Sequence, residues 1–138
     1  MGQQQLLLII LGVIIVGVAI AVGISMFSGQ SIQSNKDAIL SDLNNLGADA
    51  YQHKIRPASM GGGAGTYDAT NGGVLYAIKT AGPWGSNNPN AVYSATTVAA
   101  AAITFHGASR TVTGGTVDIT FDANGQITGT PTYSTVFQ

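Results

Sequence analysis

The sequence predicts an α+β fold: a long N-terminal α-helix, apolar and then amphipathic, packed on a small C-terminal antiparallel β-sheet. Three observations support this prediction. Residues 6–24 form an uncharged apolar run, a helical pattern of apolar residues continues to residue 55, and alternating apolar and polar residues follow near the C-terminus. We therefore expect two parts, a helical segment at residues 1–56 and a small β-rich globular domain at residues 57–138.

The apolar run reads LLLIILGVIIVGVAIAVGI, and no charged residue precedes Lys36. With a rise of about 1.5 Å per residue, such a helix nearly spans the roughly 30 Å hydrocarbon core of a membrane. A secretory signal peptide fits poorly, because its apolar region would be shorter and a basic residue would precede it. Gly12, Gly17, Gly23 and Gly29 lower helix propensity, and we hypothesise local bending or melting between them.

Apolar residues then recur at helical spacing at Ile32, Ile39, Leu43, Leu46, Ala50 and Ile55. They form one stripe of a helix, while polar residues including Asp42 fall largely elsewhere. Pro57 is expected to end this helix.

The C-terminal part contains short segments with strand periodicity. We predict strands at residues 74–78, 98–105, 110–113, 116–122 and 126–130, with hairpin connections at Gly114-Gly115 and at residues 123–125. One face of this sheet is apolar and needs a partner, which the helix stripe can supply. The predicted helix-to-sheet packing uses Ile39, Leu43, Leu46, Ala50, Val117, Ile119 and Phe121.

Composition argues against several functional classes. Charged residues make up 8% of the 138 residues, whereas about 25% is typical of soluble domains, and the formal net charge is -1. The few basic residues are scattered, so we expect no nucleic-acid partner. The chain has no cysteine, which excludes disulfides and thiolate metal sites.

No recognisable catalytic motif occurs, so we expect no enzyme activity, no metal and no cofactor. His53 and His106 lack a second ligand at metal-binding spacing, and we interpret them as surface or half-buried side chains. Asp118 and Asp122 lie four residues apart on one strand face, too far for a catalytic carboxylate pair, and we interpret them as solvated charges.

The short uncharged polar N-terminus, the apolar run, the amphipathic continuation and the small β-rich domain together resemble a type IV pilin. The resemblance is detailed over residues 1–56 and only architectural beyond them. It implies a precursor in the inner membrane, removal of a short basic leader by a prepilin peptidase, and assembly into an extracellular filament by dedicated machinery. Since no such leader is present here, the sequence looks like the mature form, starting at or near Met1.

One position departs from the usual pattern of bacterial type IV pilins, which carry a glutamate at the fifth mature position. If Met1 is the mature start, Gln5 replaces that carboxylate with an amide, which can accept a hydrogen bond but cannot neutralise an amine. Archaeal pilins and divergent bacterial relatives also lack this glutamate, so the resemblance is to a divergent subclass.

The sequence thus predicts a structural subunit, the major pilin of a type IV pilus-like filament, which polymerises with copies of itself. The residues expected to be buried in the membrane or in the filament core are Leu6, Leu7, Leu8, Ile9, Ile10, Leu11, Val13, Ile14, Ile15, Val16, Val18, Ile20, Val22, Ile24 and Phe27. Two alternatives stay open: a single-pass membrane-anchored surface protein with a ligand-binding β-domain, and a minor pilin or pseudopilin.

Overall fold

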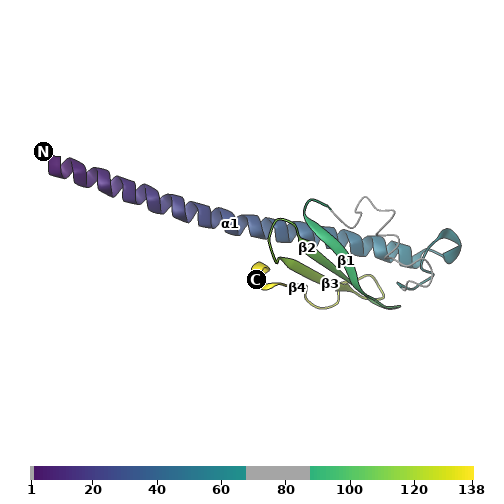
Figure 1. Ribbon diagram of the computed structural model, residues 1–138. Helices are drawn as coiled ribbons and strands as arrows, with labels where there is room; N and C mark the ends of the chain where they lie inside the picture. The colour runs from purple at the N-terminus through teal and green to yellow at the C-terminus, as the bar shows by residue number, and fades with distance from the viewer. Residues whose placement is uncertain (1, 68–87) are drawn as a thin grey trace. The chain divides into compact units, whose positions relative to one another are not determined.

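A computed structural model describes residues 2–67 and 88–138 of the chain, which form two compact units, Met1–Ser34 and Asn35–Gln138. A single helix, α1 (Gly2–Ile55), runs through both units (Figure 1). The first unit contains only helix, and the second contains the rest of α1 together with the β-sheet. The amphipathic half of α1 therefore belongs to the globular unit.

The end of α1 follows from local sequence. Lys54 occupies its last turn, where positive charge interacts favourably with the helix dipole. Pro57 adopts an extended conformation with φ of -65° and ψ of 151°, and a 3₁₀ turn, η1 (Ala58–Met60), follows it. The helix is continuous through Gly12–Gly29, so the hypothesis of melting in that stretch is wrong for the single chain.

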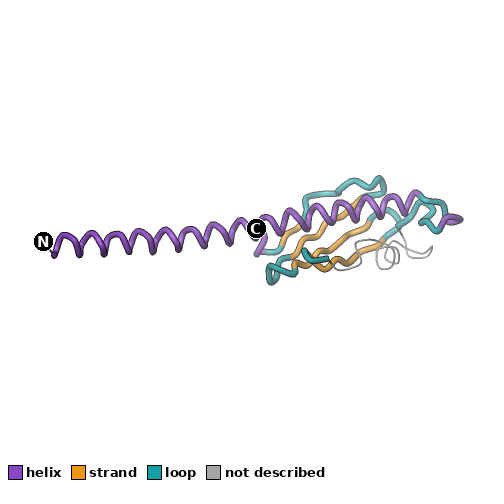
Figure 2. Tube along the Cα trace, turned by 90° about the horizontal axis from the view of Figure 1, so that it is seen from above, coloured by secondary structure: helices purple, strands orange, loops and turns teal. Residues whose placement is uncertain are grey.

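The sheet is an antiparallel meander of four strands in the order β1-β2-β3-β4 (Figures 1 and 2). The strands are β1 (Ala91–Val98), β2 (Ile103–Ser109), β3 (Thr116–Phe121) and the short β4 (Thr132–Tyr133). A further 3₁₀ turn, η3 (Thr135–Phe137), follows β4. This arrangement confirms the predicted α+β class, a long helix followed by a small antiparallel sheet.

Several predicted strand positions are corrected. The strand predicted at residues 98–105 is divided by a turn in which the Ala99 amide donates to the Ala102 carbonyl. Residues 110–113 belong to the β2–β3 connection. The Ser109 hydroxyl accepts from the amides of Thr111 and Val112, and the Gly115 amide donates to the Val112 carbonyl, which closes a turn. Residues 126–130 form only an isolated bridge, Ile127 with Phe121. The strand predicted at residues 74–78 lies outside the described residues.

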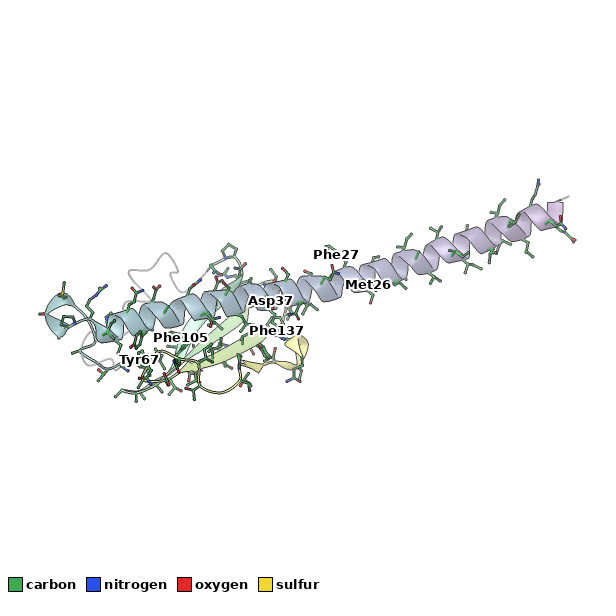
Figure 3. All side chains as sticks on the ribbon, turned by 180° about the vertical axis from the view of Figure 1, so that it is seen from behind. Met26, Phe27, Asp37, Tyr67, Phe105 and Phe137 are labelled. Carbon is green, nitrogen blue, oxygen red and sulfur yellow. The ribbon has the colours of Figure 1, made fainter. Side chains whose placement is uncertain are left out.

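The core of the globular unit lies between the sheet and α1. Alternate residues of β2 and β3 face the helix, because successive strand side chains point to opposite faces. All seven residues of the predicted helix-to-sheet packing set are buried: Ile39, Leu43, Leu46, Ala50, Val117, Ile119 and Phe121. Figure 3 shows Tyr67, Phe105 and Phe137, all buried, on the side of α1 that carries the sheet.

Two expectations about the helix stripe are wrong. Ile55, expected on the buried stripe, is 61% exposed, because α1 ends there and no described strand covers its side chain. Asp42, expected away from the stripe, is only 7% exposed. It lies next to Leu43 on the face toward β1, where polar partners satisfy it.

Gly47 allows α1 to approach the sheet closely. A Cβ atom at this position would lie 2.2 Å from Cζ of Phe121 and within 2.6 Å of two further ring atoms. The Phe121 ring also packs edge-on against Phe105, with 6.0 Å between the ring centroids. The ring therefore has little room to move aside.

We expect the substitution Gly47→Ala to destabilise the globular unit by about 1–2 kcal/mol. Alanine would gain about 1 kcal/mol in helix propensity, but the overlap with Phe121 costs about 1–3 kcal/mol or more. Thermal unfolding of the full chain in a mild nonionic detergent measures the change. Gly29→Ala is the matched control, because a Cβ there meets no atom within 4 Å. Equal midpoints for the two variants would contradict the close approach.

Candidate assembly surface and polar contacts

The first unit presents apolar side chains to its surroundings on all sides of α1. All the residues predicted to be buried in a membrane or filament core, from Leu6 to Phe27, are 50% to 75% exposed in the single chain. Figure 3 shows Met26 and Phe27 projecting from helix that no other element covers. Soluble monomers rarely expose continuous apolar surfaces of this extent. We call this surface, residues 6–27 of α1, the apolar rod.

The apolar rod is long and apolar enough to cross a membrane, and none of the most apolar stretch is buried within the chain. Its polar neighbours are uncharged at both ends. Gln5 and the two glutamines before it precede the rod, and all three are exposed. The uncharged stretch SGQSIQSN, residues 28–35, separates the rod from Lys36. Transfer of the rod from water to an apolar environment therefore requires no charged side chain to be desolvated.

In the globular unit, Asp42 is the centre of a buried polar cluster. Its Oδ2 atom accepts hydrogen bonds from the Tyr93 hydroxyl at 2.6 Å, from Asn88 Nδ2 at 2.8 Å and from Asn90 Nδ2 at 3.1 Å. The Asn88 side chain also accepts from the backbone amides of Asn90 and Ala91. The cluster therefore joins α1 to the start of β1.

This environment changes the acidity of both buried partners. Burial by itself raises the pKa of Asp42, but the hydrogen bonds from Tyr93, Asn90 and Asn88 outweigh it and lower the pKa below its usual value of 3.8. Burial, and then donation to the Asp42 carboxylate, raises the pKa of Tyr93. Asp42 is therefore a carboxylate and Tyr93 a neutral phenol at neutral pH.

Two lysines attach distant segments to α1. Lys36 Nζ donates to the carbonyl of Phe137 at 3.0 Å and lies 4.1 Å from the centre of the Tyr133 ring. Lys54 Nζ donates to the carbonyl of Ala123 and lies 4.6 Å from the centre of the Tyr67 ring. Cations over aromatic faces are stabilised by the ring quadrupole. Lys36 thus binds η3 to α1, and Lys54 binds the turn after β3 to the end of α1.

The prediction of surface or half-buried histidines holds for His106 but is wrong for His53. His53 is buried at the end of α1, and its Nδ1 atom has no hydrogen-bond partner. His106 on β2 is half-buried, and its Nδ1 atom lies 2.6 Å from Asp118 Oδ1 on β3. Asp118 is thus paired with His106, and its side chain is 38% exposed. Asp122 instead caps the turn after β3, accepting from the amides of Asn124 and Gln126.

Within residues 2–67 and 88–138, no group of three or more His, Cys, Asp or Glu side chains is placed to hold a metal ion. Sequence reasoning identified the apolar rod but missed the Asp42 cluster and the His106–Asp118 pair. The pair could have been found from the β2–β3 hairpin register, which sets His106 opposite Asp118. The Asp42 cluster had no such signal, because its partners lie 46 to 51 residues away along the chain.

Comparison of the chain with protein-family models, curated proteins and solved structures found no match.

Proposed function

We propose that this protein is a structural subunit that polymerises through its apolar rod into an extracellular filament resembling a type IV pilus. The observation that carries the proposal is the apolar rod, fully uncovered in the single chain and continuous with the helix of the globular unit. In the proposed filament, rods of many copies form the core and the globular units form the outer layer. Before assembly, the rod anchors the precursor in the inner membrane.

The energetics favour a permanent cover for the rod. Burying one Val, Leu or Ile side chain stabilises by about 1.5–3 kcal/mol, so burying the rod is worth on the order of 20 kcal/mol. That exceeds the whole stability of a typical domain, about 5–15 kcal/mol. We expect this cover to come from lipid or from other copies of the chain.

Two features favour copies of this chain as the final cover. The first charged side chain follows the rod only at Lys36, so packing rods against one another buries no charged side chain. In addition, α1 continues without interruption from the rod into the globular unit, whereas a simple anchor is expected to be joined by a polar linker. A repeated head-to-tail contact that does not close generates a fibre.

A membrane-anchored surface protein is the second candidate, and the length of the rod favours it, since lipid alone can cover such a helix. In that case the chain would stay monomeric in detergent and in vesicles. Its outward polar sheet face would then be the surface available to ligands.

Detergent removal separates the two candidates. We expect the purified full chain to form filaments of uniform width by negative-stain electron microscopy when the detergent is dialysed away without lipid. A second sample dialysed with lipid should remain in vesicles. A detergent-free sample of stable monomers, or of amorphous aggregate under every condition tried, would contradict the proposal of a filament subunit.

A further inference from the structure

Three polar side chains of neighbouring strands form a row across the sheet. Ser94 on β1 pairs with His106 on β2, and His106 pairs with Asp118 on β3. Directly opposite residues of antiparallel strands have Cβ atoms about 4.5–5.5 Å apart and share one face of the sheet. The register therefore places a hydroxyl, an imidazole and a carboxylate side by side in that order. His106 and Asp118 are in hydrogen-bond contact, whereas the Ser94 hydroxyl is a neighbour of the ring and is not hydrogen-bonded to it.

The row lies on the outward face of the sheet. Tyr93, Phe105 and Val117, which flank the three residues in sequence, are buried against the helix side. Ser94 is exposed, and the side chains of His106 and Asp118 are 29% and 38% exposed. Small molecules in solution can therefore reach the hydroxyl and the ring.

Asp118 orients the imidazole. With 2.6 Å between Nδ1 of His106 and Oδ1 of Asp118, the Nδ1–H group donates to the carboxylate. In the neutral ring this leaves Nε2 as the atom that can accept a proton. A base held in one tautomer by a carboxylate, with a hydroxyl on the other side, is the arrangement that activates a serine nucleophile.

The backbone next to Ser94 is irregular. The register of β1 against β2 shifts between Ala95 and Thr97, which is a β-bulge. Bulges increase local twist and re-aim neighbouring side chains, and they are frequent beside functional sites. This irregularity occurs in β1, immediately after the serine of the row.

We propose that Ser94 is an acyl-acceptor site, at which His106 acts as the general base and Asp118 positions the ring. The ligand class is an activated ester. Ser94 Oγ attacks the carbonyl carbon and forms a new C–O bond, while Nε2 of His106 takes the hydroxyl proton. The bond from the carbonyl carbon to the leaving alcohol then breaks, and the leaving oxygen takes that proton from the imidazolium. The product is a serine ester formed once per chain, and the reaction is independent of filament formation.

The test uses p-nitrophenyl acetate and the full chain in a mild nonionic detergent, with acetylated peptides mapped by mass spectrometry. We expect acetylation at Ser94 and its loss in Ser94→Ala. Because general-base catalysis contributes about 100-fold or more, His106→Gln should slow acetylation of Ser94 by about 100-fold. Asp118→Asn should also slow it, and Asp118→Glu should restore part of the rate. Ser134→Ala is the control and should leave the rate of acetylation of Ser94 unchanged. The Ser134 hydroxyl is not part of the row and instead accepts a hydrogen bond from the Thr116 amide.

Absence of acetyl from Ser94 in the unmodified chain would overturn the proposal. So would an acetylation rate that is the same in His106→Gln, because exposure of the hydroxyl would then explain the labelling. Amide hydrogen exchange of β2 and β3 is measured for each variant. A slower rate in a variant with unchanged exchange supports the proposed roles. If exchange in His106→Gln increases, the Asp118→Asn and Asp118→Glu pair decides: equal rates in these two variants overturn the role of Asp118.

Discussion

The substitution Ile14→Asp is expected to raise the critical concentration for filament formation by about 100-fold. Ile14 lies near the middle of the apolar rod and is 57% exposed in the single chain, so in the proposed filament its side chain lies against other rods. A carboxylate at the centre of an apolar membrane environment costs about 2.5–3.5 kcal/mol. We expect a similar cost when the carboxylate is buried among rods, because the rods carry no positively charged side chain to pair with it. That corresponds to about a 100-fold loss of affinity for each added subunit, measured as the critical concentration for pelleting after detergent removal.

Two controls isolate the cause. Ile14→Leu keeps an apolar side chain of the same size and should assemble like the unmodified chain. Val92→Asp introduces the same charge on β1 of the globular unit, where the original side chain is 40% exposed, and should assemble within a few-fold of it. An unchanged critical concentration for Ile14→Asp would show that the rod does not form the core.

The substitution Asp42→Ala is expected to destabilise the globular unit by about 3 kcal/mol. It removes the acceptor shared by Tyr93, Asn88 and Asn90 and leaves their donors without this partner, and a buried donor left unsatisfied costs about 1–3 kcal/mol. Thermal unfolding of the full chain in detergent checks the magnitude. Asp49→Ala, at an exposed position of the same helix, should change stability by less than about 0.5 kcal/mol. Similar losses in both variants would contradict a special role for Asp42.

The same cluster predicts a pH dependence. Because the folded protein lowers the pKa of Asp42, the carboxylate contributes its full stabilisation above the unfolded value of 3.8. This stabilisation declines as the pH falls below that value toward the lower pKa of the folded state. The stability difference between the unmodified chain and Asp42→Ala should therefore be constant near neutral pH and shrink in acid. A difference that grows on acidification would contradict the assigned direction.

Local sequence was sufficient to predict where the helix ends and where one of the strands lies. The helix was expected to end before Pro57 and ends at Ile55, because proline disfavours a helical conformation in the residue before it. The alternation through Val117, Ile119 and Phe121 identified β3 and its buried face correctly. Strands with weaker alternation were misplaced: Ala91–Val98 was not expected as a strand, so Ser94 could not be aligned with His106.

The sequence by itself determined the apolar rod, the amphipathic stripe and the class of the fold, because these depend on hydrophobic periodicity along a continuous segment. Only the tertiary structure decided which polar groups meet: Asp42 with Tyr93, Lys54 with the Ala123 carbonyl, and His106 with Asp118. Such contacts depend on strand register and on the close approach that Gly47 permits. A shift of one residue in the pairing of β2 with β3, for example, would turn the side chains of one strand to the opposite face and separate His106 from Asp118.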